Sequence, residues 1–493
     1  MGARLRYVRH MGDADGMTTP VATDVKKVTR PVLTAMVIGS MVGAGVFSLP
    51  ARFGTATGVA GALIAWTIAG TGMLMLAFCF QTLAIRKPDL DSGVFIYAKA
   101  GFGDYAGFNS AVGFWASTMA GNAFYWVFIT ATLGAFFPDF GDGDTLLAVG
   151  LSTVGVWVFH FLIARGVRDA AVINRVVTIF KILPIVVFIV VLGVSFDATT
   201  FGDNFFAYDD LGSMTEQVKN TMLVTTFVFI GIEGASVYSR YAQRREHVGQ
   251  ATVLGFLSVL AIFSLVTLVS YGAFGQTEIA STRQPSMVGL FEQTVGPWGE
   301  WFISAGVIVS VLGAYLAWTL MAAEVAYIPA RSNDMPRFFA RENAAGTPIT
   351  ALIATTVGVQ VLLAVTLLVD DSLNFMLDLT TSLALVPYLL AAAYALKLTL
   401  SGETYEDDSS GRRKHLVFAG LASAYAIFLF FAAGLEFLLL SCLLYAPAAV
   451  LFVIARRERG LRVFTPAELA LFVVIVAGAA IALYQLLTGG IVL

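Results

Sequence analysis

The stretch GSMVGAGVFSLP, residues 39–50, decides the fold of this chain, because it interrupts an apolar run that extends from Pro31 to about Arg52. It places three glycines and a proline where a membrane helix should be most regular. Each glycine inside a helix costs roughly 1 kcal/mol relative to alanine, and backbone groups left unpaired in hydrocarbon cost several kcal/mol each. We therefore predict a break in a membrane helix at this point, kept for a functional reason.

The composition around this stretch is that of a polytopic membrane protein. Of the 493 residues, 58% are hydrophobic and only 13% are charged, and the mean hydropathy is +0.80. Apolar runs long enough to cross about 30 Å of hydrocarbon continue to the C-terminus. We predict an all-α fold in which one transmembrane domain, residues 31–490, follows a polar, basic tail at residues 1–30.

Thirteen apolar runs are predicted to be membrane spans. The eleventh and twelfth are divided only by Gly434-Leu435-Glu436, so a count of twelve stays open. The runs lie near residues 31–53, 58–85, 104–137, 144–164, 174–195, 217–240, 249–274, 299–330, 349–369, 375–400, 415–434, 435–455 and 467–490.

The distribution of charge predicts the orientation of the chain in the cell membrane. Lys and Arg are retained on the cytoplasmic side of membrane proteins, and here the N-terminal tail and alternate loops carry most of them. The other loops are acidic, as in PDFGDGD at residues 138–144. We therefore expect a cytoplasmic N-terminus, and no apolar core of a signal peptide precedes Pro31.

No residue pattern in the sequence indicates catalysis or metal binding. Cys79 and Cys442 lie within apolar runs, which favours packing roles, and the four histidines lack the spacing of a ligand set. No stretch combines a nucleophile, a base and an oxyanion donor. We expect no enzymatic activity, no cofactor, no metal and no nucleic-acid partner; the partners are the lipid bilayer and small molecules.

A second interruption lies in the sixth run, in TTFVFIGIEGASVYS at residues 225–239. Gly231 and Gly234 flank Glu233, whose charge is expensive at mid-membrane depth unless it faces a cavity or a partner. The first and sixth runs are five spans apart, so they cross the membrane in opposite directions. Glycine-interrupted helices in corresponding positions of two inverted halves point to a binding site between them. We place the halves at about 31–195 and 217–400, with the later helices as additions.

The chemistry of two helix breaks suits an α-amino acid. Amides near Gly43, Ala44 and Gly45 can hold a carboxylate, and carbonyls around residues 229–231 can hold an ammonium group. The alternative for Gly39 and Gly43 is GxxxG packing between helices, which we would prefer for an isolated pair. The second break favours the binding interpretation.

Polar and aromatic residues on other runs are candidates for the side-chain pocket. Asn122, in ASTMAGNAFYW at 116–126, can bond a polar tip, and Trp318 with Phe227 would suit a guanidinium or a long-chain ammonium. The alternative for Trp318 is ordinary packing against neighbours or lipid.

Three ionisable residues within the apolar runs are candidates for gating or coupling. Glu233 lies deepest and is either a proton-sensitive group or an anchor for a mobile helix. Glu324 lies near Arg331, and pairing at the cytoplasmic interface is the favoured interpretation. Lys181 either extends to the cytoplasmic side or remains in the bundle as a fixed cation.

Motifs along the whole run from Pro31 resemble the basic amino acid/polyamine antiporters of the amino acid/polyamine/organocation superfamily. They include the two glycine breaks, RENAAGTP at 341–348 and LALVPYLLAAAYAL at 383–396. The further motifs LDSGVFIYAKAGFGDYAGF at 90–108 and SGETYEDDSSGRRK at 401–414 are similar to the subgroup that exchanges arginine and ornithine.

This resemblance implies a fold of two inverted five-helix repeats with interrupted first and sixth helices. It also implies secondary-active exchange of extracellular arginine for intracellular ornithine, which arginine catabolism requires, and it leaves a homodimer open. Glu233 matches a gating glutamate, and Lys181 lies where sodium-independent relatives place a lysine near a sodium position. The expected substrate-binding residues are Ser40, Met41, Gly43, Ala44, Gly45, Asn122, Phe227, Val228, Ile230, Trp318 and Thr380.

Two positions depart from the pattern of the arginine/agmatine exchangers. Phe227 replaces an indole, which weakens cation stacking without abolishing it. Ala44 replaces a serine, which leaves carboxylate binding to the backbone. The sequence also leaves open a proton-coupled uptake permease for lysine or another cationic amino acid, and a membrane amino acid sensor.

Overall fold

The computed structural model describes residues 29–90, 94–166, 170–206, 211–233, 245–406 and 408–491. Helices dominate these ranges, and no strand occurs within them. The predicted all-α fold is therefore confirmed. Most of the predicted N-terminal tail lies outside the described residues.

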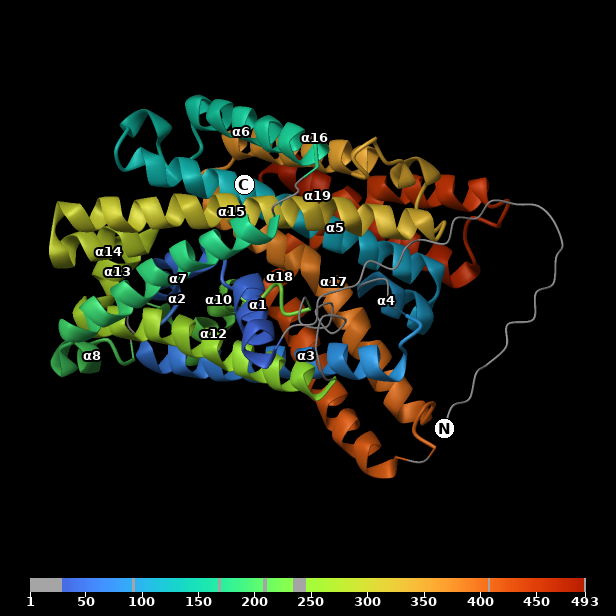
Figure 1. Cartoon of the computed structure of the whole chain (residues 1–493), viewed down its shortest axis with the longest axis horizontal. Helices are drawn as coiled ribbons and strands as arrows, with labels where there is room; N and C mark the ends of the chain where they lie inside the picture. The colour runs from blue at the N-terminus through green and yellow to red at the C-terminus, as the bar shows by residue number, and fades with distance from the viewer. Residues whose placement is uncertain are drawn as a thin grey trace, which may run out of the picture.

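Long helices occupy the apolar runs (Figure 1). Eight of the described helices are each long and apolar enough to cross a membrane, and a bent pair formed by the first run would make a ninth. The eight are α3 (Val59–Arg86), α6 (Leu146–Ala164), α12 (Arg245–Ala273), α15 (Pro297–Arg331), α16 (Ile349–Val365), α17 (Ser372–Ser401), α18 (Ser409–Glu458) and α19 (Pro466–Thr488). Two further long helices are α5 (Asp104–Gly134) and α7 (Ala170–Val194).

The element α18 covers the two runs predicted at 415–434 and 435–455. The helical path is interrupted at Gly434, whose φ is 75° and ψ is 169°. A positive φ is readily adopted only by glycine, so the chain turns at the position that the sequence indicates.

Short helices connect the long ones. The apolar runs of the sequence did not predict these short helices. They are α4 (Val94–Phe102), α8 (Ala198–Asp203), α13 (Gln276–Ser281), α14 (Ser286–Val295) and the 3-10 turns η2 (Pro138–Phe140), η4 (Arg337–Ala340) and η5 (Thr366–Leu368). In Figure 1 α8, α13 and α14 gather at one end of the bundle and α4 lies toward the other.

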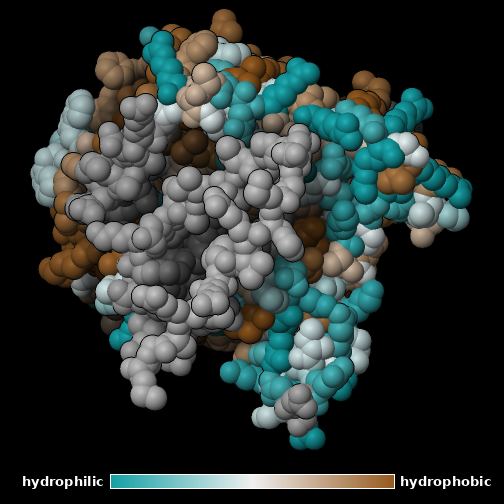
Figure 2. All heavy atoms as spheres, turned by 45° about the vertical axis from the view of Figure 1, so that its right-hand side comes forward, coloured by the Kyte–Doolittle hydropathy of each residue, from teal (hydrophilic) through white to brown (hydrophobic). Residues whose placement is uncertain are grey.

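The core of the bundle is built around α5, which packs against α15 and α17. The helix α1 (Arg30–Met41) packs against α12, and α10 (Met214–Phe227) packs against α3 and α17. Figure 2 brings the right-hand side of Figure 1 forward. Hydrophilic side chains cover much of the coloured surface at this end of the bundle, and hydrophobic side chains lie on its flank. That distribution fits a bundle with its sides in lipid and its ends in water.

Candidate binding site

The first membrane helix is broken where the glycines predict. The helix α1 ends at Met41, and the chain continues through extended backbone at Val42 and Gly43 into η1 (Ala44–Ser48) and α2 (Leu49–Ala56). Val42 has φ −72° and ψ 102°, and the two halves are bent by 56°. The prediction of a discontinuity within 39–50 is confirmed.

The break leaves backbone donors at the start of its second half. Within the described residues, the amides of Gly43, Ala44 and Gly45 donate to no side chain and to no carbonyl outside their own helix. The first amides of any helix lack intrahelical partners, and their dipoles favour an anion. Gly45 and Ala44 are buried, so these donors are shielded from bulk solvent.

The sixth helix is also interrupted. The helix α10 begins at a capping box, in which Ser213 and Glu216 bond each other's backbone amides, and it ends at Phe227. Turns follow as far as Glu233, and Gly231 has a φ of 110°, which a side chain would strain. The rest of the predicted interruption, residues 234–239, lies outside the described residues.

The two breaks are in direct backbone contact. A Cβ built on Gly231 would lie 2.4 Å from the carbonyl oxygen of Ser40, and one built on Gly45 would lie 2.8 Å from the ring of Phe227. Both distances are too short for a real side chain, so these glycines are required by the close approach of the two helices. No donor in the described part of the chain reaches the carbonyls of Ile230 and Gly231.

Lys181 remains inside the bundle and binds the end of α1. Its Nζ donates to the carbonyl oxygens of Gly39 and Val42, both at 2.9 Å. The side chain is only 4% exposed. A positive charge at the carbonyl end of a helix is stabilising, so the ammonium group of Lys181 compensates the helix end that the break creates.

Glu233 joins the second break to α17. Its Oε2 accepts hydrogen bonds from the amide of Gly231 at 3.1 Å and from the hydroxyl of Tyr388 at 2.9 Å. The residue is 6% exposed. The carboxylate therefore bridges the turn at Gly231 and a helix of the core.

The helix α5 forms the wall opposite the breaks. A Cβ built on Gly121 would lie 3.4 Å from both Trp318 and Thr380. Tyr125, one turn further, meets Trp318 edge-on with ring centroids 6.0 Å apart and lies against Gly43. Trp318 and Thr380 therefore converge on the same turn of α5, close to the first break.

Asn122 stands in this wall without a hydrogen-bond partner among the described residues. It is fully buried, and neither atom of its amide finds a donor or acceptor. Buried amides are almost always satisfied, and an unsatisfied one costs about 1–3 kcal/mol. A polar ligand at this position would remove that cost.

The remaining predicted binding residues lie around the same point. Phe227 packs edge-on against Phe124 of α5, with ring centroids 4.9 Å apart. Met41, Ala44, Val228 and Ile230 are all less than 5% exposed. The predicted binding residues thus gather where α1, α5, α10, α15 and α17 meet.

Glu324 lies outside this group. Its side chain is exposed on α15, and within the described residues no hydrogen bond or ion pair joins it to the residues around the breaks. The charges of Glu342 and Arg331 act on it. No ion pair of Glu324 forms within the described residues, so pairing at the cytoplasmic interface stays a prediction.

An ion pair that the sequence did not suggest lies beside the site. Arg52 of α2 donates to Asp378 of α17 at 2.7 Å, and the two side chains are 16% and 14% exposed. Both residues line a polar hollow that also includes Asn220 of α10. Asp378 precedes Thr380 by two residues on α17.

Two interrupted helices of opposite direction that meet at the centre of a helical bundle define the class of secondary membrane transporters. The chain belongs to the amino acid permease family, whose model matches residues 31–486. It is therefore a multi-pass membrane protein, and its fold is the inverted-repeat transporter bundle with interrupted first and sixth helices.

Individual relatives agree with this assignment. The arginine/ornithine antiporter of Pseudomonas aeruginosa is 48% identical over 472 residues, which cover 94% of this chain and 98% of that protein. The L-lysine transport protein of Corynebacterium glutamicum is 37% identical over 495 residues, which cover 97% and 99%. The crystal structure of MhsT in complex with L-phenylalanine shares the fold, with a TM-score of 0.56 at 16% identity over 83% of this chain and 99% of that one.

Proposed function

We propose that this protein exchanges extracellular arginine for intracellular ornithine across the cell membrane by alternating access. The observation that carries the proposal is the close approach of Gly231 to the carbonyl oxygen of Ser40. It brings together amides and carbonyls that have no hydrogen-bond partner among the described residues. The 48% identity to an arginine/ornithine antiporter supports the choice of substrates. The N-terminus is cytoplasmic in this proposal, and the protein is a carrier without enzymatic activity.

The two helix breaks bind the parts common to every α-amino acid. The substrate carboxylate accepts hydrogen bonds from the amides of Gly43, Ala44 and Gly45, and its α-ammonium donates to the carbonyls of Ile230 and Gly231. These groups have no other partners in the described part of the chain. Because their positions are set by close backbone packing, the site is preorganised for a zwitterion.

The wall formed by α5, α10 and α15 selects the side chain. The guanidinium of arginine stacks on Trp318, with Phe227 as the second aromatic surface, and Asn122 supplies the acceptor that its N–H groups need. A cation over an aromatic ring gains about 0.5–2 kcal/mol, depending on desolvation. Ornithine carries its charge on a shorter ammonium chain that the same rings can hold.

Exchange requires the empty carrier to reorient slowly. Without substrate, the amides of the first break, the carbonyls of the second and the amide of Asn122 have no partner among the described residues. Unsatisfied groups of this kind raise the barrier to reorientation of the empty carrier. A bound cationic amino acid satisfies all three. Opening toward the outside also requires the separation of Arg52 from Asp378, which holds α2 against α17.

Sodium is not needed in this mechanism. The ammonium group of Lys181 already supplies a positive charge to the carbonyls of Gly39 and Val42. Arginine and ornithine each carry one net positive charge near neutral pH, so their exchange is electroneutral.

A second candidate function is proton-coupled uptake of lysine or another cationic amino acid, which the 37% identity to an L-lysine transport protein favours. Proteoliposomes separate the two. Exchange predicts arginine uptake only into vesicles loaded with ornithine or arginine, whereas the permease predicts uptake into empty vesicles driven by a pH gradient. Binding of arginine with no flux in either assay would indicate a sensor and contradict both.

A further inference from the structure

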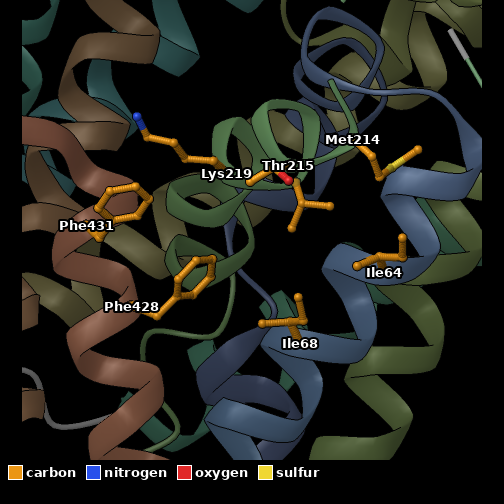
Figure 3. A pocket seen from close by; sticks show the side chains of 8 residues that line it. Ile64, Ile68, Met214, Thr215, Lys219, Phe428 and Phe431 are labelled. Carbon is orange, nitrogen blue, oxygen red and sulfur yellow. The ribbon is translucent and has the colours of Figure 1, made fainter. Parts of the chain in front are cut away.

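A groove runs along the side of the bundle between α3, α10 and α18 (Figure 3). Its volume is about 280 Å³, and its walls are formed by Ile64 and Ile68 of α3, Met214 and Val218 of α10, and Phe428 and Phe431 of α18. Ile64 is 42% exposed and Phe431 66% exposed. Because α3 and α18 are each long and apolar enough to cross a membrane, the groove opens toward the hydrocarbon of the bilayer.

One cation lies at the edge of this apolar surface. Lys219 of α10 lines the groove, and its Nζ is 5.3 Å from the centroid of the Phe431 ring. Within the described ranges, no carboxylate lies within 4 Å of this ammonium group. Glu216, three residues earlier, is held by Ser213 through the capping box at the start of α10.

The position of Lys219 places this charge at the level of lipid headgroups. The helix α10 begins at Met214, directly after its cap, so Lys219 lies in the second turn of this helix. A lysine near a helix end extends its ammonium group to the interface while its stem stays in apolar surroundings. The groove therefore combines apolar walls with a cation, Lys219, at its edge.

We propose that this groove is a binding site for an anionic phospholipid, with one acyl chain between α3, α10 and α18 and the phosphate bonded to Lys219. The ammonium group of Lys219 is complementary to the phosphate of a phospholipid, and the apolar groove is complementary to its acyl chain. A choline headgroup would place a positive charge near Lys219 and also near Arg52, because both residues line the neighbouring hollow. A glycerol headgroup adds no positive charge, so phosphatidylglycerol is favoured over phosphatidylcholine.

Photolabelling tests this site in the full-length protein. The purified protein is reconstituted into phosphatidylcholine vesicles that contain a trace of either phosphatidylglycerol or phosphatidylcholine with a photoactivatable acyl chain. After irradiation, labelled peptides are identified by mass spectrometry. We expect the phosphatidylglycerol probe to label residues 214–219 and 428–431 about fivefold more strongly than the phosphatidylcholine probe.

Matched variants identify the contribution of the cation. Lys219→Gln should lower labelling of these segments by the phosphatidylglycerol probe about fivefold, and Lys219→Arg should retain it. Lys414→Gln is the control, because Lys414 lies 5.5 Å from the ring of Phe418 on the same α18 but outside the groove. Size-exclusion profiles verify that each variant is folded.

Three results would overturn the proposal. The first is equal labelling of the groove by the two probes, which would indicate ordinary boundary lipid. The second is labelling that does not change in Lys219→Gln. The third is cross-linking of α10 to a second copy of the chain, which would mean that protein rather than lipid covers this surface.

Discussion

The carbonyl oxygen of Ser40 lies so close to Gly231 that a Cβ on this glycine would be 2.4 Å from it. The contact joins the first helix break to the second, although the two are far apart in sequence. It packs the end of α1 against the turn that follows α10. A zwitterion that fits between them can satisfy both.

Replacement of Gly231 tests this contact. Gly231→Ala should abolish high-affinity arginine binding, because the new methyl group forces Ser40 away and strains a φ of 110°. Binding is measured by isothermal titration on purified protein. Gly489→Ala is the control, since Gly489 also has a positive φ, of 75°, but has open space around it. Unchanged affinity in Gly231→Ala would mean that the breaks do not form the site.

Removal of Trp318 tests the pocket for the side chain. Trp318→Ala should weaken arginine binding about two- to thirtyfold, the range expected for loss of 0.5–2 kcal/mol of cation–π energy, and Trp318→Phe should fall between. Trp301→Ala, on the same α15 but 63% exposed, should bind normally. If the two alanine variants behave alike, Trp318 packs against its neighbours without touching substrate.

Lys181 should matter for the stability of the first break. In Lys181→Met the buried carbonyls of Gly39 and Val42 lose their donor, at about 1–3 kcal/mol each. We expect a lower thermal midpoint and slower exchange, and wild-type exchange that is the same in sodium and potassium buffers. Lys397→Met is the control, because Lys397 also donates to a helical carbonyl, that of Gly101, away from the breaks. Dependence of wild-type exchange on sodium would contradict the role given to Lys181.

The carboxylate of Glu233 should control the rate of exchange. Glu233→Gln keeps the shape but weakens acceptance from Tyr388 and Gly231, and hydrogen bonds to a charged group contribute about 1.5–3 kcal/mol. We expect counterflow at least tenfold slower in Glu233→Gln, and a smaller decrease in Tyr388→Phe. Tyr445→Phe removes another buried hydroxyl that donates to α17 and should have little effect. Wild-type kinetics in Glu233→Gln would exclude this bridge from the mechanism.

The breaks could be predicted from sequence because their physical cost is local. Glycine at 39, 43 and 45 is unfavourable in a membrane helix whatever surrounds it, and the structure has its discontinuity there. Gly434 lies in the short divider Gly434-Leu435-Glu436 between two predicted runs, and the helical path is interrupted there. The residues in the wall of the site were predicted partly from their side-chain chemistry and partly from the resemblance to a family.

Other features depend on which distant segments meet. Lys181 could equally have extended to the interface, and only its two contacts of 2.9 Å place it at the end of α1. The ion pair of Arg52 and Asp378 joins residues 326 positions apart, so neither residue alone indicates it. The short helices α13 and α14, of 6 and 10 residues, are too short to be predicted as membrane spans. They nevertheless pack against α2, where Ala51 donates to Ser286 at 3.1 Å.

A structure of the protein with bound arginine tests the central claim most directly. The account predicts the substrate carboxylate within hydrogen-bond distance of the amides of Gly43–Gly45 and its ammonium group at the carbonyls of Ile230 and Gly231, with the guanidinium against Trp318. Arginine bound elsewhere, or bound to side chains alone while these backbone groups stay unoccupied, would contradict it.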